Sequence, residues 1–525
     1  MICKEGAALE KKGFGQDHKR YAVAAIAAAV FYFLCNGYRF FNPLLSGDAL
    51  LMLYQNDAAW QIALGRVGQP FLVFLRGGIA SPFLISVLAM FWIALSVVIV
   101  TDLLDLSSTG SILSAAAVMG CHISFIAANA NFLPWVDFYG FALFLATGGI
   151  WLLRKERKAT KIAGIVALAI CMSVYQAYIC VAIGLMMICL LLDLLKKSDV
   201  KRYFINALLS AGALLCGALL YLGFWKVIQK SLHIWTADSY NGLAGVGDYS
   251  DGSIFTVLGF TYANVLDYFL DPLRFITMTF REKDLSIVWT IVLRIGNIAA
   301  FGILLYLLIL RNKTAKTALW QKIMQAVLLL LFPFGINFVC FMSKGMEHSL
   351  MIYAFCLVYV LLLAVLEQST PEDQKQRISS GIVITVCLII ALQTWSHIVY
   401  ANQVWVKKQA QEEAARSLMM RIESVIEQAE GYIPGETPVA FAGSFEISPY
   451  IQAQDAFSNL QPWGTAQTAL SYIGTDYAYL AYFENMKLNL TRIDAQDERV
   501  RKMPCYPLAG SVDYIDGVLV VKISD

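Results

Sequence analysis

Long apolar segments constrain this chain more than any other feature of its sequence. A helix needs roughly 20 mainly apolar residues to cross the hydrocarbon core of a bilayer. Of the 525 residues, 58% are hydrophobic and 15% are charged, whereas soluble domains are about one quarter charged. We therefore predict an all-α polytopic membrane protein with about eleven spans. The predicted spans are 21–41, 79–100, 112–130, 135–153, 162–174, 178–195, 203–228, 286–310, 324–341, 350–366 and 381–400.

Basic residues gather on one side of these predicted spans. Because Lys and Arg accumulate in cytoplasmic loops, that side and the N-terminus are predicted to be cytoplasmic, in an inner or plasma membrane. The other side then carries the segments 42–78 and 229–285 and everything after residue 400. The basic clusters lie at 11–20, 154–161, 196–202, 311–322 and 372–377.

The chain after residue 400 differs in character from the apolar spans. It opens with a charged segment of helical period and continues with two strand-like pieces, 437–445 and 517–524, separated by Gly and Pro. We predict two domains: a transmembrane domain at 1–400 and a small extracytoplasmic α/β domain at 401–525.

The first predicted external segment, "NPLLSGDALLMLYQNDAAWQIALGRVGQP" from residue 42, places acids and an arginine at the membrane surface. Asp48 and Asp57 lie nine residues apart, so a continuous helix would present them on opposite faces. Gly65 and Gly68 are predicted to end that helix around Arg66. The alternatives are a helix cap for Asp48, a solvated acid for Asp57 and an arginine that reaches lipid headgroups.

Four parts of the chain carry a resemblance to a known family. The pattern D-x8-D-x2-W-x4-GR, which begins at Asp48, resembles the start of the bacterial type-II O-antigen glucosyltransferases, the Gtr family. "SVYQAYI" at 173–179 resembles the Tyr-Gln hairpin of that family, and "MEHSLMIYAF" at 346–355 resembles a later segment. With the helix opening at 402, the resemblance covers roughly residues 37 to 443.

The resemblance implies a GT-C class integral membrane glycosyltransferase. Its donor would be a polyprenyl-phosphate-linked sugar, typically undecaprenyl phosphate glucose, and its acceptor a cell-surface polysaccharide at the outer face. An acid in the first external loop would act as the catalytic base, and one-step displacement would invert the sugar. The family usually shows two adjacent acids where this chain has Gly47 and Asp48. Asp48 is therefore the favoured base, and Asp57 is the candidate for the second role.

Several basic residues are candidates to hold the donor phosphate, which would lie at headgroup depth where Arg or Lys can neutralise it. Arg66 is favoured because it follows the acids directly. For each candidate, the alternative role is a charge that faces lipid headgroups. The other candidates are Arg76, Arg274, Lys344 and His348.

Aromatic and amide side chains near these charges are candidates to contact the sugar: Trp60, Tyr175, Gln176 and Trp235. Trp235 lies on a polar, Gly-rich segment, where an aromatic ring stacks on a sugar or anchors the chain at the membrane surface. For Gln176 in its tight hairpin, core packing is the alternative to lining a cavity.

The sequence specifies no cofactor. Asp238, Asp248 and Asp251 cluster without the spacing of an EF-hand, so a divalent metal stays open. Without a long basic tract, nucleic acid is not expected as a partner. Two rival functions are a lipid or polysaccharide transporter, which predicts charges in mid-span, and a non-enzymatic assembly protein, which predicts that Asp48 tolerates substitution.

Overall fold

The computed structural model describes residues 2–42, 44, 49, 57–196, 199–237, 249–271, 283–368, 380–443 and 488–525. Within these ranges, nine helices are long and apolar enough to cross a bilayer. Helices α9 (Lys158–Val174) and α16 (Leu357–Gln368) are shorter and occupy two further predicted spans. Every predicted span therefore contains a helix, which confirms the all-α polytopic class. The nine involve α1 (Ile2–Phe41), α5 (Pro82–Leu103), α6 (Thr109–Gly120) with α7 (Ile123–Asn131), α8 (Val136–Leu153), α10 (Ile179–Leu195), α11 (Val200–Ser231), α13 (Lys283–Thr314), α14 (Leu319–Ile336) and α17 (Ser380–Glu427).

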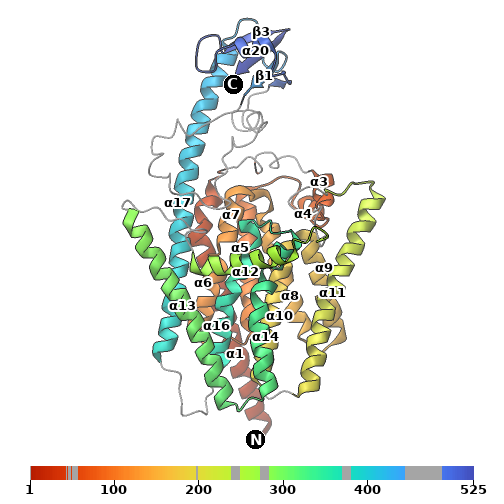
Figure 1. Ribbon diagram of the computed structural model, residues 1–525, viewed down its shortest axis with the longest axis vertical. Helices are drawn as coiled ribbons and strands as arrows, with labels where there is room; N and C mark the ends of the chain where they lie inside the picture. Colours follow the sequence, from red (N-terminus) through yellow and green to blue (C-terminus); the bar gives the residue numbers. More distant parts are fainter. Residues whose placement is uncertain are drawn as a thin grey trace.

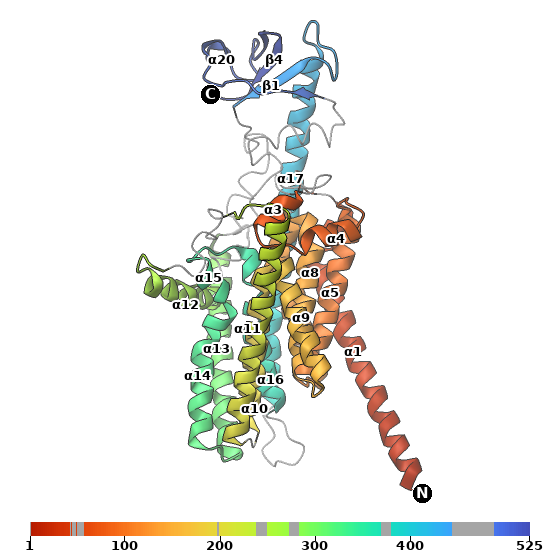
Figure 2. The ribbon, with the colours of Figure 1, turned by 90° about the vertical axis from the view of Figure 1, so that its right-hand side faces the viewer.

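The bundle has two distinct ends. Helix α17 leads out of the bundle to a small β-sheet at one end, and the N-terminus lies at the other (Figure 1). We call these ends the sheet-side face and the N-terminal face. Figures 1 and 2 place the short helices α3 (Ala58–Ala63) and α4 (Gln69–Leu75) at the sheet-side face, beside the end of α11.

The span at 109–131 is broken in its middle, between α6 and α7. His122 begins α7 as its N-cap, because its Nδ1 atom accepts a hydrogen bond of 3.3 Å from the Ser124 N–H group. The hydroxyl of Tyr353 donates to the Met119 carbonyl at the end of α6, at 2.9 Å. Side chains thus satisfy backbone groups that a broken helix leaves without partners, and the break stays fully buried.

Helix α12 (Ile254–Leu270) corrects the prediction of a long loop at 229–285. It lies across the direction of the spans in both views (Figures 1 and 2). One side packs on the bundle, where the Tyr262 hydroxyl donates to the Leu330 carbonyl at 3.0 Å, and the other side exposes Phe255 and Phe260. The hydropathy of the sequence did not predict this helix, because one half of its surface packs on the bundle and the other half is exposed.

Helix α17 runs for 48 residues without interruption and passes through the predicted domain boundary at residue 400. The division into two domains stays a prediction. Beyond α17 the described strands form a sheet in the order β2-β1-β4-β3, comprising β1 (Pro438–Ala442), β2 (Asn489–Leu490), β3 (Val512–Ile515) and β4 (Val518–Lys522). β1 pairs in parallel with β2 and β4, whereas β3 and β4 form an antiparallel hairpin. The two strand-like pieces of the sequence are β1 and β4.

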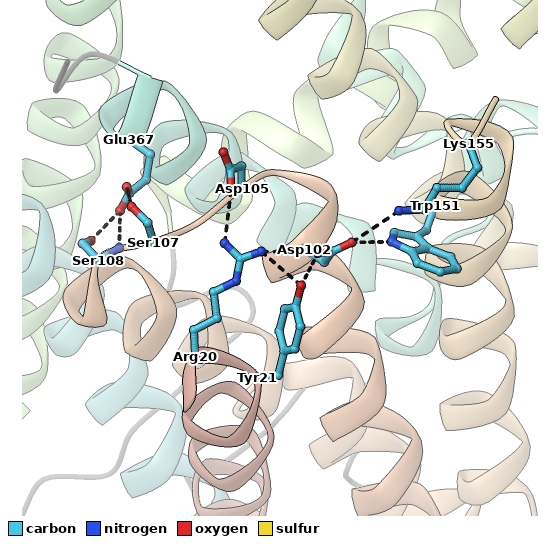
Figure 3. Close-up of polar contacts among 9 residues, drawn as sticks. All are labelled: Arg20, Tyr21, Asp102, Asp105, Ser107, Ser108, Trp151, Lys155 and Glu367. Carbon is cyan, nitrogen blue, oxygen red and sulfur yellow. Dashed lines mark hydrogen bonds and ion pairs between the residues drawn. The ribbon is translucent and has the colours of Figure 1, made fainter. Parts of the chain in front are cut away.

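Polar side chains tie the helices together at the N-terminal face (Figure 3). The Asp102 carboxylate accepts hydrogen bonds from Tyr21 and from Trp151, the latter at 2.6 Å, and Arg20 reaches it at 3.3 Å. Arg20 also pairs with Asp105 at 3.1 Å. One carboxylate therefore joins the middle of α1 to the ends of α5 and α8.

Candidate active site

A six-residue helix and the turn after it build the centre of the sheet-side face. Asp57 caps α3, because its carboxylate accepts a hydrogen bond of 2.8 Å from the Trp60 N–H group. Gly65 ends the helix at φ +80°, a left-handed conformation that favours glycine. The Arg66 N–H group then bonds back to the Gln61 carbonyl at 2.8 Å. This confirms the predicted break, and it fixes the backbone at Arg66.

Arg66 is the cation that this turn presents. Its guanidinium carbon lies 5.1 Å from the centre of the Tyr175 ring, a distance at which a cation interacts with an aromatic face. Its Nε atom is buried without a hydrogen-bond partner, and no ion pair involves Arg66 in the part of the chain that the structure describes. The side chain is half-buried, so the site holds a positive charge that no described acid neutralises.

The hairpin between α9 and α10 bonds to the turn that carries Arg66 and to the residues on either side of it. The Gln176 side-chain nitrogen donates to the Leu64 carbonyl at 2.8 Å. Gln69 donates to the Val174 carbonyl at 2.9 Å, and the Gly68 N–H group donates to the Ser173 carbonyl at 2.8 Å. The structure therefore brings Tyr175 and Gln176 together with Arg66, and it shows Gln176 bonded to backbone rather than aimed at open space.

Arg76 is placed very differently from Arg66. It forms an ion pair of 2.7 Å with Asp137, and both side chains are almost fully buried. Its second nitrogen donates to the Pro134 carbonyl at 2.8 Å, and its guanidinium stacks 4.6 Å from the centre of the Phe138 ring. These bonds join α4 to the start of α8. Arg76 therefore has a structural role, and Asp137 neutralises its charge.

Lys344 and His348 lie on the segment between α15 (Phe338–Met342) and α16. Lys344 pairs with Asp251 at 3.1 Å. Hydrogen bonds from Ser253, followed by that from Lys344, lower the pKa of Asp251 to about 2. The His348 ring meets the Phe132 ring edge-on with centres 5.5 Å apart, and burial lowers the pKa of His348 to about 4. His348 is therefore a neutral residue at pH 7, and the charge of Lys344 has a partner.

The family model described as Glucosyl transferase GtrII matches residues 37–359. The match includes more than half of the chain and spans α3, the Arg66 turn, the hairpin at 173–178 and Lys344. The chain belongs to the GtrII glucosyl transferase family. It is thus a membrane glucosyltransferase, and the resemblance drawn from the sequence motifs is confirmed. No curated protein and no solved structure matches the chain.

The remaining predicted residues of this GtrII glucosyltransferase are dispersed. Trp60 packs with Leu64 and Ala63 under the turn. Trp235 is 58% exposed and lies four residues beyond the end of α11. Asp57 is exposed as the cap of α3. The favoured base Asp48 and the phosphate candidate Arg274 lie outside the described residues.

Metal binding finds no support in the part of the chain that the structure describes, where no three His, Cys, Asp or Glu side chains form a group that could hold a metal ion. Asp238 and Asp248, two of the three acids that left a metal open, lie outside the described residues.

Two further residues contact the turn that carries Arg66, and nothing in the sequence indicated this. Tyr221 and Trp225 lie near the end of α11, and both donate hydrogen bonds to the backbone between residues 62 and 65. Tyr and Trp are common where a span meets the membrane surface, so their sequence gives no signal of this contact. Their partners lie more than 150 residues away in the chain.

Proposed function

We propose that this GtrII glucosyltransferase moves glucose from a polyprenyl-phosphate donor, such as undecaprenyl phosphate glucose, to a cell-surface polysaccharide such as an O-antigen. The observation that carries the proposal is the charge of Arg66. A cation that is half-buried, stacked on an aromatic ring and not neutralised by a described acid suits a phosphate group. The exposed leucines and phenylalanines of α11, a helix that contacts the same turn, would give a polyprenyl chain access from within the bilayer.

Arg66 is the favoured phosphate contact among the predicted cations. Arg76 is committed to Asp137, and Lys344 is paired with Asp251. A phosphate at Arg66 would replace the water that the guanidinium otherwise keeps, and it would gain charge-assisted hydrogen bonds. Each bond of this kind contributes about 1.5–3 kcal/mol.

Asp48 is the proposed general base, from its place in the family motif. Its carboxylate would take the proton from the acceptor hydroxyl while the hydroxyl oxygen attacks the anomeric carbon of the glucose. The bond from that carbon to the phosphate oxygen breaks at the same time, and the polyprenyl phosphate leaves with the electron pair. Attack from the side opposite the phosphate inverts the carbon. Asp57 is proposed as the second acid, which also holds the start of α3.

The sheet-side face is proposed to be extracytoplasmic, in an inner or plasma membrane, with the N-terminus in the cytoplasm. The asymmetry of basic residues supports this orientation. The described basic residues of the N-terminal face lie in α1 and at the ends of α8, α9, α10, α11, α13 and α14. They are Lys19, Arg20, Arg154, Lys155, Arg157, Lys158, Lys161, Lys196, Lys201, Arg202, Arg311, Lys313, Lys316 and Lys322.

Membership of a glucosyl transferase family supports transfer over the two rival functions, the transporter and the assembly protein. The residues after α16, including the sheet, lie outside the matched region. For the sheet we propose only an extracytoplasmic location.

Transfer of labelled glucose from undecaprenyl phosphate glucose tests this proposal. Membranes that contain the wild type should glucosylate host surface polysaccharide, and Asp48→Asn should lose about 10²–10⁴-fold in rate, the usual contribution of a general base. Asp199→Asn is the matched control, because Asp199 caps α11 at the N-terminal face and Asn caps as well as Asp. A wild type that consumes no lipid-linked glucose would overturn the proposal.

A further inference from the structure

Helix α11 is an outlying helix whose inward contacts are few. It is 32 residues long, and its only buried residues are Tyr203, Gly217, Tyr221 and Gln229. Leucines and phenylalanines cover the rest of its surface and are exposed. Tyr221 and Trp225 are separated by one helical turn and therefore lie on one face. Their rings stack with centres 6.0 Å apart.

This face of α11 meets the end of α3. Trp225 Nε1 donates to the Ile62 carbonyl at 2.7 Å, and the Tyr221 hydroxyl donates to the Gly65 carbonyl at 3.1 Å. Gln176 completes the set by donating to the Leu64 carbonyl and to the Tyr221 hydroxyl, at 2.8 and 2.9 Å. The Ile62 carbonyl belongs to α3 and also accepts from the Gly65 N–H group at 3.0 Å, whereas Leu64 and Gly65 belong to the turn after the helix. Three side chains from two other elements therefore bond to the end of α3 and to the turn that follows it.

The fit between these donors and the turn leaves no spare room. A Cβ atom on Gly65 would lie 2.4 Å from the Tyr221 hydroxyl oxygen and 2.7 Å from the Gln176 side-chain nitrogen. Only glycine permits such an approach. A helix of six residues is too short to be stable alone, so these contacts determine where α3 and the Arg66 backbone lie.

An aromatic belt at the membrane surface does not account for Tyr221. Belt residues keep their polar atoms in water or among headgroups, whereas Tyr221 is 6% exposed and its hydroxyl bonds to backbone and to Gln176. The polar atoms of both rings are turned toward the turn that carries Arg66.

We propose that Tyr221 and Trp225 are positioning residues that hold the Arg66 turn in place for the donor phosphate. This inference rests on the proposed function of Arg66. It connects a lipid-facing helix directly to the phosphate contact. Removing one of these bonds is expected to displace the guanidinium and weaken donor binding, while the acceptor, which does not meet Arg66, is unaffected.

Steady-state kinetics of the full-length protein in lipid, with undecaprenyl phosphate glucose as donor, test this inference. Tyr221→Phe keeps the ring and its stacking but removes the hydroxyl. We expect its KM for the donor to rise about 3- to 10-fold, the equivalent of one lost hydrogen bond, with an unchanged KM for the acceptor. Tyr262→Phe is the matched control, because it removes a tyrosine bond to a backbone carbonyl of a neighbouring helix away from Arg66. Its donor KM should equal that of the wild type.

The Arg66→Gln background separates the two proposals. Tyr221→Phe should add nothing to the donor KM of Arg66→Gln, because it acts through Arg66. If Arg66→Gln raises the donor KM while Tyr221→Phe alone does not, or if the two effects simply multiply, the positioning role is overturned and the phosphate contact stands. If Arg66→Gln leaves the donor KM unchanged, the phosphate contact itself is overturned, and the positioning role with it.

Discussion

The two faces of the bundle use charge in opposite ways. At the N-terminal face, Asp193 pairs with Arg154. Asp102 and Asp105 both pair with Arg20, and Asp102 accepts two further hydrogen bonds (Figure 3). At the sheet-side face, Arg66 has a ring beneath it and no described acid beside it. Paired charges hold helix ends together. A cation without a described acid beside it, on a turn held by hydrogen bonds, is consistent with the proposed contact to the donor phosphate.

The contrast also separates two arginines within the sheet-side face. Arg76 lies at the end of α4 and is neutralised by Asp137, in the manner of the N-terminal face. Arg66 lies only ten positions earlier and is not. Distance along the sequence therefore says little about which cation serves the donor, and the environment of each side chain decides it.

The largest effect is expected from breaking the buried Arg76–Asp137 pair. Asp137→Ala leaves a buried guanidinium without its partner, which should destabilise the protein by about 3–5 kcal/mol. Unfolding of the purified protein in detergent measures this. Arg76→Met combined with Asp137→Leu should recover most of the loss. If Asp137→Ala instead left the stability unchanged, the structural role of the Arg76–Asp137 pair would be contradicted.

A smaller effect is expected at the N-terminal face. Asp102→Asn removes the charge that Arg20 and Lys155 contact, and it replaces one acceptor with a donor. We expect a loss of about 1–3 kcal/mol in stability and an unchanged kcat/KM for the folded fraction. Thermal unfolding measures the stability of Asp102→Asn, and donor kinetics on the same preparation measure its kcat/KM. A fall in kcat/KM without a loss of stability would show that the N-terminal face is not purely structural.

Glycine substitutions sharpen the comparison within one face. Gly65 and Gly77 both have φ +80°, but a Cβ on Gly77 meets nothing within 4 Å. Gly77→Ala should cost only the left-handed backbone strain, about 1–2 kcal/mol. Gly65→Ala should cost that strain and also displace Tyr221 and Gln176, so its donor KM should rise while that of Gly77→Ala does not. An equal donor KM for both variants would argue against a positioning role for the contacts of Tyr221 and Gln176 with the Arg66 turn.

The smallest effect concerns His348 and pH. Its pKa is lowered to about 4 in the folded protein by burial, against about 6.5 for an unfolded chain. The unfolded state therefore binds a proton first as pH falls, and folding stability decreases below about pH 6.5. Between about pH 7.5 and 5.5 the loss should be about 1 kcal/mol. His348→Gln should remove this part of the pH dependence, and a pH profile identical to that of the wild type would contradict the assignment.

Hydropathy predicted the spans well because apolar length is a local property of the sequence. The prediction failed for α12, where the apolar surface is divided between bundle and exterior. It also treated α17 as two segments, because the charged residues after Tyr400 change the composition but not the helical period.

The sequence predicted only part of the candidate site. The pattern around Asp57, Gly65 and Arg66 predicted a helix that ends at glycine, because caps and left-handed turns are local. The hydrogen bonds from Tyr221 and Trp225 to the Arg66 turn were not predictable, since the packing of α11 on α9 is what brings their donors and acceptors together. The same holds for Asp137, whose partner Arg76 lies 61 residues earlier.

Binding of a prenyl phosphate glucose to the purified full-length protein tests the central claim most directly. The affinity of Arg66→Gln should fall by about tenfold or more, the equivalent of a lost charge-assisted hydrogen bond. Arg157→Gln, the same substitution of an exposed arginine at the N-terminal face, should bind as the wild type does. Equal affinities for Arg66→Gln and the wild type would contradict the account, because Arg66 would then not be the contact for the donor phosphate.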